Sequence, residues 1–277
     1  MNAAAPIPES TDSRGPLLDV RSLSVSTADG AALVSDVSFS VAPGERLGLI
    51  GESGSGKSLT SFAVTGLLPG GLVASGSAML DGLEVIGARE KELVGIRGSV
   101  ASVIFQEPLT ALDPLMRLGK QVAEPLRRHL GLRGGALRSA VLEALAEVRL
   151  PEPERIARAY PHEISGGQRQ RVAIAAALAC KPRLLIADEP TTALDVTVQA
   201  EILALLDSLV SDRRMALIFV SHDLAVVSRM TDHALVLRHG RVVERGPIDR
   251  ILSAPSDPYT IELVQSAREL DAALEVS

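Results

Sequence analysis

The fold of this chain is decided by the residues Gly51-Glu52-Ser53-Gly54-Ser55-Gly56-Lys57-Ser58, which match the phosphate-binding pattern G-x-x-x-x-G-K-[ST]. An apolar run of strand length, residues 47–50, precedes this loop, and a helical pattern follows it from Leu59. A strand, a glycine-rich loop and a helix in this order bring backbone N–H groups together around one anion. We therefore expect Lys57 to reach the β- and γ-phosphates of a nucleotide and the Ser58 hydroxyl to bind Mg²⁺. The missing third glycine excludes a Rossmann dinucleotide site.

Short apolar runs elsewhere in the chain predict an α/β fold. Near-continuous runs are typical of strands covered on both faces, and they occupy residues 47–50, 102–105, 184–187, 216–220 and 234–237. Helical patterns separate most of them, which indicates a mostly parallel sheet between two layers of helices. Residues 17–25 and 34–41 instead alternate apolar with polar side chains, and residues 78–80 precede an Asp-Gly turn. They predict an N-terminal antiparallel β subdomain.

Composition along the chain predicts four parts. Residues 1–16 are expected to be a disordered leader, and residues 248–277 a helical C-terminal extension. Residues 17–89 and 164–247 are predicted to form the nucleotide-binding core with its β subdomain. Residues 90–163 are rich in Ala, Leu, Arg and Glu, which predicts an inserted helical subdomain with a buried stripe of Val141, Leu145 and Val148.

One uncharged stretch, residues 59–80, is long enough to span a bilayer. Pro69, Gly70 and Gly71 interrupt it, so we expect a buried helix that ends near Leu68 and a turn after it.

Overall composition excludes several kinds of partner and site. The chain has 28 Lys and Arg against 34 Asp and Glu, a net charge of −6, and only two Tyr, four Phe and no Trp. A nucleic-acid partner is therefore not expected, because both charge attraction and stacking platforms are scarce. The single cysteine, Cys180, excludes a disulfide framework, a cysteine-based zinc site and an iron–sulfur cluster. It fits a reducing compartment, which suggests the cytoplasm.

A second motif, residues 184–189, is a buried strand that ends in two carboxylates, Asp188 and Glu189. Ligands of open α/β sheets bind beyond the carboxyl ends of the strands, so these side chains are expected near the nucleotide. Asp188 is suited to orient Mg²⁺ through water, and Glu189 to act as general base toward the attacking water. A strand that merely ends in solvated acids is the alternative, which the phosphate loop disfavours.

A third motif, residues 164–170, contains Ser165, two glycines and Gln168. Ser165 and Gln168 have the spacing of a capping box, which is the structural explanation. Capping needs no glycines, however, and Gly166 with Gly167 could form a second anion-binding helix N-terminus. Because one chain has no second triphosphate, we favour a nucleotide presented by another subunit.

Together these motifs resemble the ATP-binding subunits of ABC transporters over nearly the whole chain, from Leu17 onward. Residues 51–58 are similar to the Walker A motif, 165–168 to the signature motif and 184–189 to the Walker B motif. In the expected order stand residues similar to the Q-loop, the D-loop and the switch histidine: Gln106, Thr192-Ala193-Leu194-Asp195 and His222. The resemblance implies a RecA-like core and an ATP and Mg²⁺ site between two such subunits. One departure is the segment Val25-Ser26-Thr27, which lacks the aromatic residue that usually stacks on adenine.

The resemblance also implies a role for each matching residue. ATP would contact Gly51, Glu52, Ser53, Gly54, Ser55, Gly56, Lys57, Ser58 and Leu59 of one subunit, and Ser165, Gly166, Gly167, Gln168 and Asp195 of the other. The Mg²⁺ ligands would be Ser58, Gln106 and Asp188, and the catalytic residues Glu189, His222 and Gln106.

Four further segments, residues 103–114, 160–163, 193–200 and 255–260, are similar to the branch that imports oligopeptides, dipeptides or nickel. That branch implies a peripheral protein at the cytoplasmic face of the membrane. Its partners would be a second, non-identical ATP-binding subunit, two membrane permease subunits and, indirectly, an extracytoplasmic solute-binding protein.

Other functional classes fit the sequence less well. A soluble, non-transport ABC ATPase is the main alternative, but zinc cysteines, a long coiled coil or a second ATPase unit are not found. A P-loop GTPase would need the motif N-K-x-D, and the only asparagine is Asn2. A subunit that binds ATP without hydrolysing it is disfavoured by the presence of Glu189 and His222.

Overall fold

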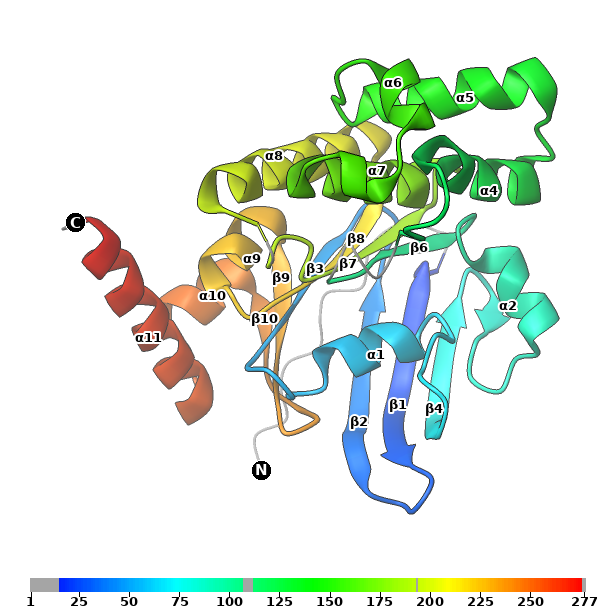
Figure 1. Ribbon diagram of the computed structural model, residues 1–277. Coiled ribbons are helices and arrows are strands. Elements are labelled where there is room, and N and C mark those ends of the chain that lie inside the picture. The colour runs from blue at the N-terminus through cyan, green and yellow to red at the C-terminus, as the bar shows by residue number, and fades with distance from the viewer. Residues whose placement is uncertain (1–14, 107–111, 193, 276–277) are drawn as a thin grey trace. The chain divides into compact units, whose positions relative to one another are not determined.

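The computed structural model describes residues 15–106, 112–192 and 194–275 (Figure 1). It divides into two compact units, one formed by residues 1–93 with 216–277 and the other by 94–215. Most of the predicted leader, residues 1–16, lies outside the described residues. The predicted helical subdomain, residues 90–163, falls largely within the second unit, which also holds residues 164–215. The functional division into core and helical subdomain stays a prediction.

The first unit contains the predicted antiparallel β subdomain. Its four strands have the order β2-β1-β4-β5: β2 (Ala32–Val41), β1 (Leu18–Thr27), β4 (Leu72–Leu80) and β5 (Leu83–Glu84). In β1, Leu18 and Val20 are buried, and so are Leu23 and Val25 after a shift of one position. The shift coincides with a break in the register at Ser22, which has a φ of 46°. This bulge keeps both apolar pairs on the core face.

The same unit holds the strands around the phosphate loop. β3 (Arg46–Ile50) pairs in parallel with β8 (Ala216–Ser221) on one side and with β9 (His233–Arg238) on the other. β10 (Arg241–Pro247), which the sequence did not predict, returns antiparallel to β9. The predicted strands 47–50, 216–220 and 234–237 are thus confirmed within one or two residues. Helix α1 (Lys57–Ala63) packs on β8, and α9 (Leu224–Met230) packs on β3 and β8.

The C-terminal extension of the first unit is helical. Helix α10 (Ile248–Ser253) packs on β9 and β10, and α11 (Pro258–Glu275) contacts β10 and α9. Figure 1 shows α11 in red beside these elements.

The second unit combines two strands with a cluster of helices. β6 (Ala101–Ile104) and β7 (Leu184–Asp188) pair in parallel. Four helices contact one another and include the predicted stripe of Val141, Leu145 and Val148, which is buried. They are α4 (Leu118–Leu130), α5 (Gly134–Glu147), α6 (Pro153–Arg158) and α7 (Gly166–Leu178). A 3₁₀ turn, Pro161–Glu163, precedes α7, and α8 (Val196–Arg213) packs on α7. Along the chain, the division between the two units falls within helix α2 (Glu90–Ile96).

The uncharged stretch 59–80 differs from its prediction. Helix α1 ends at Ala63 rather than near Leu68, and residues 72–80 form strand β4. The early end follows from a turn in which Gly66, with a φ of 67°, donates its N–H to the carbonyl of Ala63, while Leu67 donates to Phe62. Of the helices that the structure describes, none is both long and apolar enough to cross a bilayer.

We predict that Gly119→Ala destabilises the second unit. A Cβ at Gly119 would lie 2.7 Å from the carbonyl oxygen of Ala157, a backbone atom that cannot move away by changing a side-chain rotamer. We expect the free energy of unfolding to fall by about 1–3 kcal/mol, which urea denaturation measures. The matched control is Gly95→Ala, also in a helix but with open space around the new Cβ, which should be neutral or gain about 0.5–1 kcal/mol. Equal stability of both variants would contradict the close helix contact.

Candidate functional site

The phosphate loop connects the end of β3 to the start of α1. Gly51, Gly54 and Gly56 have φ angles of 149°, 79° and 101°, in the region where side chains are strained. At Gly51 a Cβ would also lie 2.2 Å from the carbonyl oxygen of Leu237, so backbone crowding requires glycine there. No side chain caps the N-terminus of α1. The loop therefore presents backbone N–H groups at this helix N-terminus, as an anion site requires.

Lys57 is 5% exposed and folds over its own loop. Its Nζ donates to the carbonyl oxygens of Gly51 and Glu52 at 2.6 and 2.8 Å. The hydroxyl of Ser55 is buried and has no hydrogen-bond partner among the described residues. A buried cation, an unpartnered hydroxyl and an uncapped helix N-terminus are groups that a phosphate would satisfy, so the loop fits the predicted nucleotide.

His222 lies in the turn between β8 and α9. The register pairs Ile50 with Ser221, so the phosphate loop and His222 leave the sheet at the same edge. The turn is ordered by Ser221, whose Oγ accepts the N–H of Asp223 at 3.0 Å, and by Asp223, which caps α9 through the N–H of Val226 at 3.1 Å. The His222 side chain is exposed beyond this edge.

In the second unit the structure brings Gln106 and Glu189 together. Ile104 pairs with Ala187, so both side chains follow neighbouring parallel strands at one edge. Gln106 Nε2 donates to Glu189 Oε2 at 3.3 Å. Thr192 Oγ1 donates to the same oxygen at 2.9 Å, a contact that sequence reasoning missed although Thr192 belongs to the predicted D-loop. Asp188, one residue earlier, is 2% exposed.

Glu189 itself has an unusual backbone. Its φ is 45°, a left-handed conformation that costs a residue with a side chain energy of order 1 kcal/mol or more. The two hydrogen bonds to its carboxylate help to hold this conformation. Strained residues cluster at functional sites, so the observation agrees with a chemical role for Glu189.

The third motif has the predicted capping box. Ser165 Oγ accepts the N–H of Gln168 at 3.3 Å, and Gln168 Oε1 accepts the N–H of Ser165 at 3.1 Å. Gly167 is explained by packing, since its Cβ would lie 2.7 Å from a methyl group of Val198. Gly166 is not, because its Cβ would meet only Leu194 at 3.8 Å. Of these two glycines, Gly166 is thus the one that packing within the folded chain does not require.

Two further polar residues, Asp195 and Gln170, make structural hydrogen bonds. Asp195 caps α8 by accepting the N–H of Val198 at 3.0 Å, so it has a structural role besides the predicted nucleotide contact. Gln170, which sequence reasoning missed, is fully buried and donates from Nε2 to the carbonyl oxygen of Pro190 at 2.6 Å. It joins helix α7 to the segment that follows Glu189. A polar residue on the buried face of an apolar helix was the available sequence signal.

The predicted ligands suit a metal ion that is held together with substrate phosphates, and not a metal site built from protein side chains alone. In the described part of the chain no group of three or more His, Cys, Asp and Glu side chains could hold a metal ion. The predicted set of Ser58, Gln106 and Asp188 supplies hydroxyl, amide and carboxylate oxygens, which suit Mg²⁺ held jointly with substrate phosphates. Ala193 of the D-loop and residues 107–111 of the segment 103–114 lie outside the described residues.

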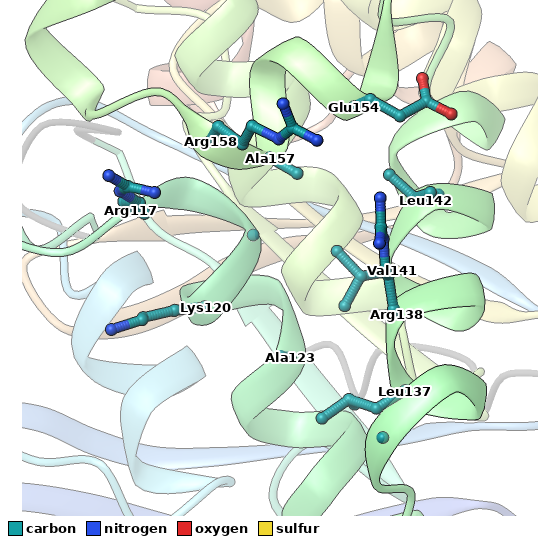
Figure 2. Close-up of a pocket in the computed structure, with 12 residues that line it drawn as sticks. Arg117, Lys120, Ala123, Leu137, Arg138, Val141, Leu142, Glu154, Ala157 and Arg158 are labelled. Atoms are coloured by element: carbon teal, nitrogen blue, oxygen red, sulfur yellow. The ribbon is translucent and has the colours of Figure 1, made fainter.

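A separate feature of the second unit is a pocket of about 420 Å³ between α4, α5 and α6. Its wall is mainly apolar, and four exposed cationic residues surround it with one carboxylate, Glu154. Figure 2 shows the guanidinium groups of Arg138 and Arg158 near Glu154, and the charged ends of Arg117 and Lys120 at another side of the pocket. The apolar lining residues are Ala123, Leu137, Val141, Leu142 and Ala157.

The profile of a family described as ABC transporter matches residues 34–192. The chain is 45% identical over 271 residues to the oligopeptide transport ATP-binding protein OppD of Escherichia coli (strain K12), a match that covers 97% of this chain and 80% of that protein. It is 46% identical over 254 residues to the peptidoglycan transport ATP-binding protein YejF of Agrobacterium fabrum. That match covers 90% of this chain and 46% of the longer relative.

Solved structures match the fold. A dimeric ATP-binding cassette in a post-hydrolysis state, bound to ADP and phosphate, is 29% identical with a TM-score of 0.73, over 83% of this chain and 98% of that one. The cbiO1 protein of Clostridium perfringens, described as part of an ABC transporter complex, is 26% identical with a TM-score of 0.73, over 95% and 99% of the two chains.

Proposed function

The chain belongs to the ABC transporter family of ATPases, and on that premise we propose that it hydrolyses Mg²⁺–ATP to drive an importer of peptides, nickel or a similar small solute. The length of the match to the oligopeptide transport protein of Escherichia coli supports the peptide branch. The similarity of segments 160–163 and 255–260 to that branch also supports it.

The observation that carries hydrolysis is the position of the Glu189 carboxylate. Two donors, Gln106 Nε2 and Thr192 Oγ1, hold Oε2 at the carboxyl edge of β7, directly after the buried Asp188. A carboxylate held in this way can orient a water molecule and accept its proton. We propose that Glu189 is the general base, that Gln106 and Asp188 orient the Mg²⁺ shell, and that His222 contacts the γ-phosphate.

The phosphate loop supplies binding rather than chemistry. Its backbone N–H groups and the Lys57 ammonium would neutralise the phosphates, and the hydroxyl of Ser58 would bind Mg²⁺. Lys57 exchanges its two carbonyl partners, Gly51 and Glu52, for phosphate oxygens when a nucleotide enters. Bound Mg²⁺–ATP supplies the scissile phosphoanhydride bond and a cation that offsets developing charge.

We further propose that ATP is shared between two subunits. Ser165, Gly166, Gly167 and Gln168 would contact the nucleotide held by the phosphate loop of the other subunit, with Asp195 beside them. The capping box explains Ser165 and Gln168, and packing explains Gly167, but Gly166 lies at the exposed start of α7 without a packing reason. An approaching phosphate group is the reason we assign to it. We propose that the other subunit is a non-identical ATP-binding protein.

The membrane partners of this complex would be two permease subunits at the cytoplasmic face, with an extracytoplasmic solute-binding protein acting through them. We propose that the pocket between α4, α5 and α6 receives a cytoplasmic permease segment that is acidic and partly apolar. Four cations against one carboxylate favour an acidic segment, and the apolar lining favours a buried side chain.

Replacing the proposed base tests the mechanism. We expect Glu189→Gln to bind ATP as the wild type does, because the phosphate loop is untouched, and to hydrolyse it about 10²–10⁴-fold more slowly. Fluorescent ATP binding and phosphate release measure the two quantities. Glu143→Gln, an exposed carboxylate of α5, serves as control and should hydrolyse at the wild-type rate. Retained hydrolysis in Glu189→Gln would exclude Glu189 as the base.

The identity of the second subunit can be tested in the assembled importer. Two copies of this chain with different tags, both carrying Glu189→Gln so that ATP holds the subunits together, are co-produced with the importer's other subunits. Purification through one tag in ATP should recover a different ATP-binding protein and not the second tag. Recovery of both tags without another ATPase would show that identical copies pair. Lys57→Ala, which weakens phosphate binding, is the control for nucleotide-dependent pairing.

The permease pocket can be tested by reversing its charge. Lys120→Glu with Arg138→Glu should weaken retention of the permease subunits about 10-fold or more, because an acidic segment would then meet like charges. The matched control is Arg128→Glu with Arg133→Glu, both exposed, one on α4 and one immediately before α5, and both outside the pocket lining. Affinity capture at fixed salt, with equal unfolding midpoints as the folding check, gives the readout. Equal retention of permeases by both double variants would refute this docking surface.

A further inference from the structure

We propose that Tyr259, at the start of the C-terminal helix α11, is a positioning residue for the phosphate loop. Its hydroxyl accepts the backbone N–H of Glu52 at 2.9 Å, across a separation of 207 residues. Glu52 is the second residue of the loop. The inference rests on the proposed ATPase function for its consequence, but the contact itself is independent of that function.

The two polar backbone groups of Glu52 have different partners. Lys57 Nζ donates to its carbonyl oxygen at 2.8 Å, while Tyr259 holds its N–H. In the proposed function Lys57 leaves that carbonyl when phosphate binds. The Tyr259 contact does not depend on Lys57, so it keeps the first turn of the loop in place during the exchange. A loop that is already ordered loses less conformational entropy on binding.

Two further residues hold Tyr259 in place, one at its ring and one at its backbone. The ring is 3% exposed, and the Arg238 guanidinium lies over it at 4.7 Å from the centroid. Asp257 Oδ1 accepts the N–H of Tyr259 at 2.8 Å. Arg238 is the last residue of β9, and the preceding Leu237 is the residue whose carbonyl crowds Gly51. The ring and the loop are therefore both packed against the end of the same strand.

The turn before Tyr259 is held by Glu244 of β10, which is 9% exposed. Its carboxylate accepts the N–H and the hydroxyl of Ser256, both at 2.8 Å, and the N–H of Asp257 at 3.1 Å. Burial raises the pKa of Glu244, but these hydrogen bonds outweigh burial and hold the pKa below its ordinary value. Glu244 thus remains ionised, and the turn keeps its anchor, at neutral pH.

The phenol is suited to a neutral hydrogen bond. Burial is the main cause that raises the pKa of Tyr259 above its ordinary value, so the hydroxyl keeps its proton at neutral pH. The segment 255–260 thereby acquires a role that its sequence did not reveal. It connects the C-terminal extension to the loop that binds the nucleotide.

Tyr259→Phe is the test, because it removes only the hydroxyl and leaves the ring under Arg238. Without nucleotide, we expect hydrogen–deuterium exchange of the peptide that contains Glu52 to accelerate, while the unfolding midpoint stays near that of the wild type. We also expect the KM for ATP to rise about 2- to 10-fold, the range of one lost hydrogen bond, with little change in kcat.

The matched control is Thr231→Val, which replaces only a buried hydroxyl that donates to the carbonyl oxygen of Val227 at 2.9 Å and is part of neither the loop nor the turn before Tyr259. It should lower the unfolding midpoint without changing exchange at Glu52 or the KM. If Tyr259 were merely structural, Tyr259→Phe would behave like this control, with a lower unfolding midpoint and unchanged exchange at Glu52 and KM. Unchanged exchange at Glu52 in Tyr259→Phe, or parallel effects of both variants on exchange and stability, would overturn the proposal. If the wild type fails to hydrolyse ATP, the proposed function falls, and the exchange experiment still decides the Tyr259 contact.

Discussion

Parallel pairing of strands is the constraint on which the chemistry of this protein depends. Parallel neighbours end at the same edge of a sheet, so whatever follows them in the sequence is brought together there. The pair β3 and β8 places the phosphate loop and His222 at one edge, and the pair β6 and β7 places Gln106 beside Glu189. In each pair the strand interiors are nearly all buried, and the polar residues begin where the strands end.

Several residues of the candidate site also support the fold locally. Ser165, Asp195 and Asp223 cap three helices. Ser165 and Asp223 stand beside Gly166 and His222, which have proposed roles, and Asp195 is itself assigned a nucleotide contact. A cap of this kind typically contributes about 1 kcal/mol. The same short segments therefore order the helix N-termini and place the reactive groups. At Glu189 the local conformation instead opposes folding, because its backbone is left-handed. Hydrogen bonds from Gln106 and Thr192 to its carboxylate hold this conformation.

The C-terminal extension gives the first unit a connection that motif order does not contain. Glu244, the turn at Ser256 and the Arg238 guanidinium fix the start of α11, and Tyr259 transmits that position to the backbone of Glu52. The phosphate loop is thus ordered by its own glycines and by a segment 207 residues away. In this chain the extension is part of the environment of the nucleotide loop.

The sequence by itself determined the motifs, the class of fold and most strand positions, because these depend on short-range backbone conformation and on the period of apolar residues. The glycines of the loop, the capping box at Ser165 and the antiparallel β subdomain were all predictable in this way. Tertiary structure alone decided β10, the packing of Gly167 on Val198, and the contacts of Glu189 and Tyr259. A continuous apolar run carries no information about which strand lies beside it. Contacts between distant residues therefore follow from strand order and helix packing, which local patterns do not encode.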